Sequence, residues 1–202
     1  MGLEILAKEA FENCVVDFAI NGFEILKKVS EKKYDLLFTD MNMPNTNIFD
    51  LLHQITELRP DLKILVISIN PEDAFAKRIS DSGALGFISK SALDAELKDA
   101  MLQVASGNKY YPKQVSRQSL EPNDRKPTSN PFNTLSTREF EVALLLLKGN
   151  GALEISNKLS INASTASSYK ARVFQKLKIT SVIELDRLAR LNQVITDDSM
   201  LH

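Results

Sequence analysis

The 202-residue chain carries 25 basic and 26 acidic residues, has a net charge of −1, and is 44% hydrophobic, which fits two small globular domains. A single cysteine, Cys14, excludes an intramolecular disulfide and a thiolate metal cluster, and two histidines leave no histidine cluster for zinc. No signal segment follows Met1 and no apolar run is long enough to cross a membrane, so we expect a cytoplasmic protein without a membrane partner.

The first half of the chain alternates short apolar runs with amphipathic stretches. It opens with an amphipathic stretch at residues 1–13, which predicts a helix. Four apolar runs predict strands, at residues 15–20, 35–39, 64–69 and 86–89. Four amphipathic stretches predict helices, at residues 22–32, 49–58, 71–82 and 91–105. Strand and helix in strict alternation indicate a parallel sheet covered on both faces.

Three polar residues fall at the ends of consecutive predicted strands. They are Asp40, Ser68 and Lys90. Such sheets bind ligands beyond the carboxyl ends of their strands, so these side chains should meet there. A carboxylate can attack a phosphoryl group, a hydroxyl can hydrogen-bond its oxygens, and an ammonium can neutralise the added negative charge. Together the three residues predict a phosphoryl-transfer site, although each one alone is also common at a loop or surface.

The segments around these residues resemble the receiver domain of bacterial two-component response regulators. The matching segments are Y-D-L-L-F-T-D-M-N-M-P at 34–44, I-L-V-I-S at 64–68 and S-G-A-L-G-F-I-S-K-S-A at 82–92. The resemblance implies that Asp40 is the phosphoacceptor in the complete form of the receiver, that Ser68 and Phe87 are the switch residues, and that Lys90 pairs with the phosphate. It also implies a sensor histidine kinase as partner and Mg²⁺ as cofactor, held in part by Asp40 and the carbonyl of Asn42.

One part of the family pattern has no counterpart in this chain. The family's sheet begins with a strand that ends in two adjacent acidic residues, which help to hold magnesium, whereas residues 1–13 predict a helix. In the family's strand order the missing strand lies between those at 15–20 and 35–39. We therefore expect a flavodoxin-like sheet truncated at its N-terminus, with a core gap and weak or lost magnesium binding. Either the chain start is truncated or misassigned, or the receiver is degenerate.

Charge and proline content divide the chain. Residues 1–107 hold 11 basic and 17 acidic side chains, and residues 133–195 hold nine and five. Residues 108–132 carry four prolines and no apolar periodicity, which predicts a linker between a receiver at 1–107 and a second domain at 133–195. Residues 196–202 form a short tail. An acidic first half and a basic second half suggest domains with different partners.

The second domain reads as four helices. Ser136 and Glu139 are spaced as a capping box for the first, and Gly149 should end it. A short second helix runs through Leu159, a turn follows, and Asn162 can cap a third helix. The window 155–183 around this third helix holds five Lys or Arg and no Asp or Glu, which suits the DNA backbone. Two helices joined by a tight turn, the second basic, indicate a helix-turn-helix.

The segments L-S-T-R-E-F-E-V, E-I-S-N-K-L-S-I, S-T-A-S-S-Y-K-A-R and K-L-K-I resemble the LuxR-type helix-turn-helix. The whole chain thus resembles a NarL/FixJ-family response regulator, which implies double-stranded DNA and RNA polymerase as partners. By this resemblance the base-facing residues are Ser167, Ser168 and Ala171. The residues placed for phosphate contacts are Thr165, Tyr169, Lys170, Arg172 and Lys176. The family pairs through its fourth helix, which here begins at Ser181 and offers an apolar seam at Leu185, Leu188 and Leu191.

Two other functions are open to this sequence. An aspartyl nucleophile also occurs in haloacid-dehalogenase-like phosphatases, but their motif needs a second Asp two residues on, where this chain has Asn42. An enzyme is therefore not expected. A DNA-binding regulator that ignores phosphorylation is the stronger alternative, because the acidic pair is missing.

Overall fold

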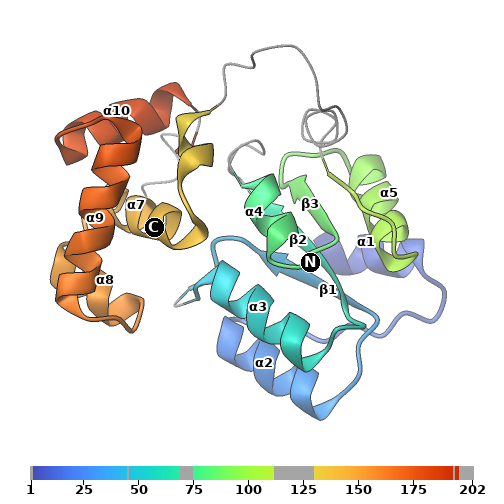
Figure 1. Ribbon diagram of the computed structural model, residues 1–202. Coiled ribbons are helices and arrows are strands. Elements are labelled where there is room, and N and C mark those ends of the chain that lie inside the picture. Colours follow the sequence, from blue (N-terminus) through green and yellow to red (C-terminus); the bar gives the residue numbers. More distant parts are fainter. Residues whose placement is uncertain (1, 45, 69–74, 112–129, 193, 196–202) are drawn as a thin grey trace. The chain divides into compact units, whose positions relative to one another are not determined.

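The computed structural model describes residues 2–44, 46–68, 75–111, 130–192 and 194–195. The chain forms two compact units, Met1–Pro122 and Asn123–His202 (Figure 1). The first unit combines a parallel sheet with helices, and the described part of the second is helical. Most of the predicted linker, residues 112–129, and the tail, residues 196–202, lie outside the described residues.

The sheet of the first unit has three parallel strands in the order β1-β2-β3. They are β1 (Leu36–Asp40), β2 (Lys63–Ser68) and β3 (Gly86–Ser89). Asp40 pairs in register with Ile67, and Ser68 with Ser89, so the carboxyl ends of the strands lie side by side. The central strand, β2, is buried along nearly its whole length, as expected of a strand covered on both faces. Three of the four predicted strands are confirmed.

Five helices accompany this sheet in the described residues. They are α1 (Gly2–Ala10), α2 (Gly22–Glu31), α3 (Ile48–Leu58), α4 (Ala76–Asp81) and α5 (Asp94–Ala105). Helices α1 and α5 lie on one side of the sheet, with α2 and α3 on the other (Figure 1). Leu6 of α1 joins Leu65, Ile88 and Met101 in one buried cluster, which fastens α1 to the sheet through α5. The first residues of the predicted helix 71–82 lie outside the described residues.

The strand predicted at residues 15–20 is absent, although the structure describes this whole segment. A strand needs a neighbour whose main chain it can hydrogen-bond. The family's neighbour for this segment is the strand that residues 1–13 do not supply, because Gly2–Ala10 is helical. Val15, Phe18 and Ile20 are consequently 79%, 61% and 71% exposed. In the described sheet, β1 is an edge strand.

The segment after α5 returns to the free edge of β3. Tyr110 forms an isolated parallel bridge with Gly86, and the main-chain N–H of Phe87 donates to the carbonyl of Tyr110 at 2.9 Å. The hydroxyl of Tyr111 donates to the carbonyl of Ala84 at 2.5 Å. Residues 110 and 111, which the sequence assigned to the linker, are therefore part of the first unit.

The second unit contains a short 3-10 helix and four α-helices in its described part. They are η2 (Pro131–Thr134), α7 (Thr137–Leu147), α8 (Ala152–Lys158), α9 (Ala163–Leu177) and α10 (Val182–Leu191). The capping box of Ser136 and Glu139 is confirmed, and Gly149 follows α7 with a φ of +80°. Asn162 occupies the cap position of α9, but its side chain makes no capping hydrogen bond. Phe132 packs edge-on against Phe140, which ties η2 to α7.

Candidate phosphoacceptor site and nucleic-acid interface

The structure brings Asp40 and Lys90 into direct contact at the carboxyl end of the sheet. Asp40 is the last residue of β1, and Lys90 follows β3 immediately. The ammonium Nζ of Lys90 lies 2.6 Å from Oδ2 of Asp40, and the main-chain N–H of Asn42 donates to Oδ1 at 3.0 Å. Both oxygens of the carboxylate thus have a donor, and the carboxylate is fixed in orientation.

Ser68 and Phe87 lie on the two strands that complete this end of the sheet, and both are fully buried. Ser68 ends β2, and its carbonyl accepts a 2.7 Å hydrogen bond from the main-chain N–H of Lys90. Phe87 of β3 lies in register with Val66 of β2. Ile88 contributes to the cluster beneath α1 and α5, so Phe87 points to the opposite face of the sheet. The switch roles implied for Ser68 and Phe87 stay predictions.

The Asp40–Lys90 pair is open to water. The side chains of Lys90 and Asp40 are 41% and 32% exposed. Exposed ion pairs contribute about 0–1 kcal/mol to stability, because solvent screens them and both side chains lose conformational entropy. The pair therefore adds little to the stability of the fold, but it holds a positive charge beside the carboxylate of Asp40.

The residues around Asp40 do not fit a tight magnesium site. Mg²⁺ prefers near-octahedral oxygen ligands and usually takes one or two carboxylates. Among the described residues, no three His, Cys, Asp or Glu side chains gather where they could hold a metal ion. Of the predicted ligands, only Asp40 offers a carboxylate, and Lys90 already occupies one of its oxygens. Asn42, the other predicted ligand, is exposed and would add its main-chain carbonyl, which carries no charge.

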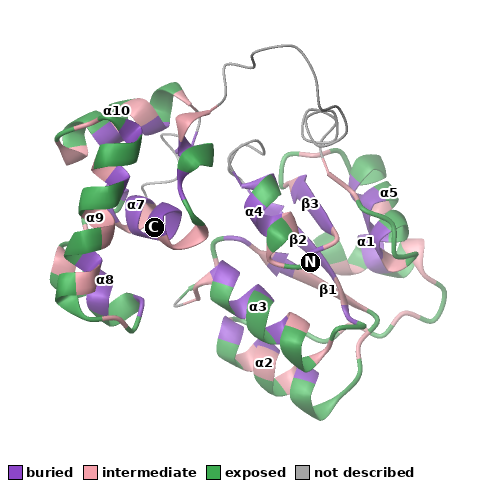
Figure 2. Cartoon of the chain, viewed as in Figure 1, coloured by how far each residue is buried: buried purple, intermediate pink, exposed green. Residues whose placement is uncertain are grey.

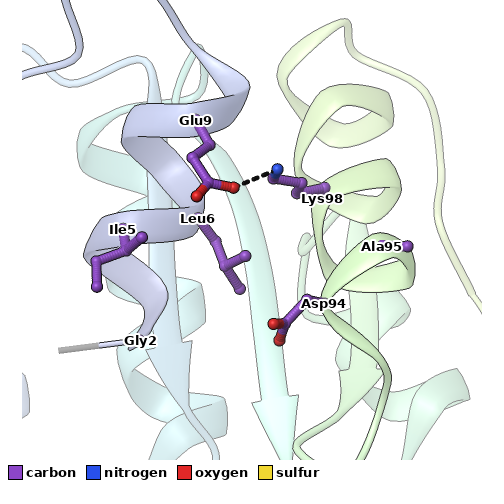
Figure 3. Close-up of a pocket in the computed structure, with 7 residues that line it drawn as sticks. All are labelled: Gly2, Ile5, Leu6, Glu9, Asp94, Ala95 and Lys98. Carbon is purple, nitrogen blue, oxygen red and sulfur yellow. Dashed lines mark ion pairs between the residues drawn. The ribbon is translucent and has the colours of Figure 1, made fainter.

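A groove between α1 and α5 is separate from this set of residues (Figure 3). Its volume is about 360 Å³, and an ion pair between Glu9 and Lys98 crosses it. Its lining residues are Gly2, Ile5, Leu6, Glu9, Asp94, Ala95 and Lys98. None of the predicted site residues lines this groove.

Helix α9 exposes most of its predicted DNA-contacting residues (Figure 2). Ala166, Val173 and Leu177 form its buried stripe against the rest of the unit. Ser167, Ser168, Ala171, Arg172 and Lys176 are exposed, and Thr165, Tyr169 and Lys170 are half-buried. This arrangement leaves a face of hydroxyls, a small residue and cations free to approach a ligand.

Two of the three cations of α9 lie against aromatic rings of the same helix. The guanidinium of Arg172 lies 5.8 Å from the ring centroid of Tyr169, and the ammonium of Lys170 lies 5.5 Å from that of Phe174. Such contacts favour a cation over the ring face. They hold two of the predicted phosphate-contacting side chains close to the helix surface.

Sequence reasoning missed two links between α7 and the helix-turn-helix. Lys176 of α9 binds the buried Glu139 of α7 at 2.6 Å. Arg138 of α7 binds Glu141 at 2.7 Å and donates to the carbonyl of Leu159, the residue that caps α8, at 3.1 Å. The sequence contained one indication of the first link. Lys176 lies directly before Leu177 and three residues after Val173, and both of these apolar residues belong to the buried stripe of α9.

The apolar seam predicted on α10 is only partly exposed. Leu185 is fully buried and Leu188 is half-buried, whereas Leu191 is 71% exposed. Ile183, which the sequence analysis did not assign to the seam, is 82% exposed. Ile183 and Leu191 are eight residues apart and so share one face of the helix. The surface available to a partner is therefore Ile183 and Leu191.

Comparisons with known proteins agree with both units. The response regulator receiver domain model matches residues 3–102, and the model for bacterial regulatory proteins of the luxR family matches residues 133–189. Response regulator GacA of Pseudomonas aeruginosa is 34% identical over 176 residues, which cover 87% of this chain and 82% of GacA. The chain is a response regulator of the NarL/FixJ family. Response regulator UvrY of Escherichia coli K12 is 31% identical over 176 residues, which cover 87% of this chain and 81% of UvrY.

A solved structure confirms the fold of this response regulator. RcsB from Salmonella enterica serovar Typhimurium, bound to promoter rprA with the phosphomimetic BeF3−, matches with a TM-score of 0.74 and 23% identity. The match covers 94% of this chain and 91% of that RcsB chain. With its receiver and luxR-type domains, the chain is a transcriptional response regulator of a two-component system. No helix in the described ranges has the length and apolarity needed to cross a membrane.

Proposed function

We propose that this response regulator acts in the cytoplasm, accepts a phosphoryl group on Asp40, and binds double-stranded DNA through α9. The observation that carries the receiver half of the proposal is the 2.6 Å contact between Lys90 and Asp40. A carboxylate, a hydroxyl and an ammonium come from the carboxyl ends of three neighbouring strands. This combination suits phosphoryl acceptance better than it suits a structural ion pair.

The proposed transfer needs few groups. An Asp40 carboxylate oxygen forms a bond to phosphorus as the bond between phosphorus and a histidine nitrogen of the sensor kinase breaks, and the freed imidazole leaves with that electron pair. Lys90 then neutralises part of the added charge, and the Ser68 hydroxyl hydrogen-bonds a phosphoryl oxygen. Phe87, the second predicted switch residue, would change its position in response to Ser68.

The DNA half of the proposal rests on the exposed face of α9. Arg172 and Lys170 would contact phosphates, while Ser167 and Ser168 would face base edges. One of the similar structures contains two RcsB dimers bound to two parallel DNAs, which supports a DNA-bound dimer for this chain as well. We assign the dimer contact to Ile183 and Leu191, and we propose RNA polymerase as the partner at the promoter.

A second candidate function is DNA binding that does not depend on phosphorylation. The single carboxylate at the candidate site favours it, because Asp40 is the only acidic residue that the prediction places there. In that case Lys90 would act as a permanent countercharge to Asp40.

One experiment separates the two candidates. The full chain is incubated with a small phosphodonor at increasing Mg²⁺, phosphorylation is followed by intact mass, and affinity for a promoter duplex is measured in parallel. Asp40→Asn serves as the control that cannot be phosphorylated. The first function predicts that the fraction of the chain that becomes phosphorylated, which should be small because magnesium is held weakly, binds the duplex more tightly, and that Asp40→Asn loses this effect. Equal DNA affinity with and without donor, in both proteins, would support the second.

A further inference from the structure

The carboxylate of Glu139 receives donors from both sides of the junction between α7 and α9. Its Oε2 accepts from the main-chain N–H of Ser136 at 2.7 Å and from Nζ of Lys176 at 2.6 Å. Lys176 also donates to the carbonyl of Thr134 at 3.3 Å. A side chain of α9 is therefore bound to the turn that starts α7.

These contacts use much of the hydrogen-bonding capacity of Lys176. An ammonium has three N–H groups, and two protein acceptors already face it here. Lys176 stands three residues after Val173 and directly before Leu177, both of which are buried. Lys176 is exposed like Arg172, but its side chain is bound to groups at the start of α7, whereas Arg172 has a ring of its own helix as neighbour.

The carboxylate of Glu139 is buried and therefore needs Lys176 as a partner. Glu139 is 4% exposed, and a buried carboxylate that loses its partner is strongly destabilised. Burial acts to raise the pKa of Glu139, but hydrogen bonds from Lys176 and Ser136 outweigh it, and the pKa lies below its ordinary value. Glu139 is charged at neutral pH and holds Lys176 in place.

Arg138 and Glu141 provide a comparable link to the other helix of the helix-turn-helix. Arg138 donates to Glu141 and to the carbonyl of Leu159, which ends α8. The first turn of α7 is consequently joined to α8 by a hydrogen bond from Arg138 and to α9 by the ion pair between Glu139 and Lys176. Both links hold the helix-turn-helix against the start of α7.

We propose that Glu139, acting through Lys176, is a positioning residue for DNA recognition: the pair fixes α9 so that Ser167 and Ser168 face the bases, and Lys176 makes no phosphate contact of its own. This inference rests on the proposed binding of DNA by α9. It replaces the phosphate contact that the resemblance assigned to Lys176 with a role inside the protein.

The test compares salt dependence with specificity. The full chain and its Lys176→Gln, Glu139→Gln and Arg172→Gln variants are titrated against a promoter duplex and a scrambled duplex at several salt concentrations. Arg172→Gln is the matched control for a true phosphate contact, and it should lower the slope of log affinity against log salt by about one per half-site. Lys176→Gln and Glu139→Gln should leave that slope unchanged. Each should reduce the ratio of specific to scrambled affinity by about tenfold.

Two further arms keep the inference open to refutation if a Gln variant folds poorly. Lys176→Arg retains the ion pair and should keep the specificity ratio of the parent, and the double variant should lose no more specificity than either single variant. A lowered salt slope for Lys176→Gln, together with unchanged specificity for Glu139→Gln, would overturn the inference while leaving DNA binding intact. Salt-independent or absent DNA binding by the parent chain would instead overturn the proposed function.

Discussion

Lys90 and Asp40 are 50 residues apart in the chain, yet their charged groups lie 2.6 Å apart at the end of the sheet. The parallel register of β1, β2 and β3 creates this proximity, because parallel strands all have their carboxyl ends at the same end of the sheet. Since the pair is exposed, its electrostatic stabilisation is small. Stability therefore does not explain the pair at the carboxyl end of the sheet, which agrees with the phosphoryl acceptance proposed for Asp40.

Replacing Lys90 by Ala should therefore separate stability from signalling. We expect the free energy of unfolding of the first unit to change by less than about 1 kcal/mol, because an exposed ion pair is lost. Any phosphate-dependent change in DNA affinity should disappear in the Lys90→Ala variant. Amide hydrogen exchange in β2 and β3 reports the stability, and duplex titration with and without phosphodonor reports the signal. A loss of several kcal/mol would mean that Lys90 has a structural role that its exposure does not reveal.

Phosphate uptake by this chain from small phosphodonors should be poor. Among the described residues the predicted ligands are the carboxylate of Asp40 and the carbonyl of Asn42, where the family uses an additional acidic pair, so magnesium should bind weakly. Intact mass after incubation with donor at increasing Mg²⁺ measures the yield, with Asp40→Asn as the blank. Stable, stoichiometric, magnesium-dependent modification would contradict this expectation.

The sequence was sufficient to predict the sheet and the convergence of Asp40 and Lys90. Apolar runs bounded by helical stretches locate buried parallel strands, and the direction of the crossovers then determines where their ends meet. The same pattern was misleading at residues 15–20. Val15, Phe18 and Ile20 have the composition of a strand, but composition cannot supply the neighbouring strand that would pair with them.

The ion pair between Glu139 and Lys176 was beyond sequence reasoning for a different reason. Glu139 was recognised as a local capping residue, and its second partner lies 37 residues away on another helix. Which exposed lysine turns back toward a buried carboxylate depends on how α9 packs against α7, and residue spacing within one helix does not determine that packing.

Tyr111 should titrate at unusually high pH. Burial raises the pKa of its hydroxyl from 10.0 to about 12, because the phenolate form loses solvation. A pKa raised by folding stabilises the protein fully below the unfolded pKa, so this contribution should be lost as pH rises from about 10 toward 12. Ultraviolet absorbance of phenolate, compared between the parent and Tyr111→Phe, measures the pKa. A tyrosine titration near pH 10 in the difference curve would show that Tyr111 is solvated and would contradict this expectation.

Dimer formation on DNA should depend on the exposed apolar face of α10. Leu191→Ser should weaken binding to a two-half-site duplex by tenfold or more, since fully burying a leucine contributes about 1.5–3 kcal/mol. Leu153→Ser is the matched control, because Leu153 is 68% exposed on α8 of the same unit. Mass measurement of the complex distinguishes one bound chain from two. A monomeric complex with a footprint on one half-site would count against this interface.

The exposed face of α9 predicts which substitutions change affinity and which change sequence preference. Lys170→Ala and Arg172→Ala should weaken binding to all duplexes about equally and lower the salt slope by roughly one per half-site, because phosphates carry no sequence information. Ser167→Ala and Ser168→Ala should shift preference among operator variants by on the order of 1 kcal/mol. The hydroxyl of Ser168 donates to the carbonyl of Ser164 at 2.9 Å, so its oxygen remains available as an acceptor for a base amino group. Titration of each variant against specific and scrambled duplexes at two salt concentrations decides between the two behaviours. If the cation variants changed base preference while the serine variants lost affinity uniformly, α9 would lie in the groove in a different orientation.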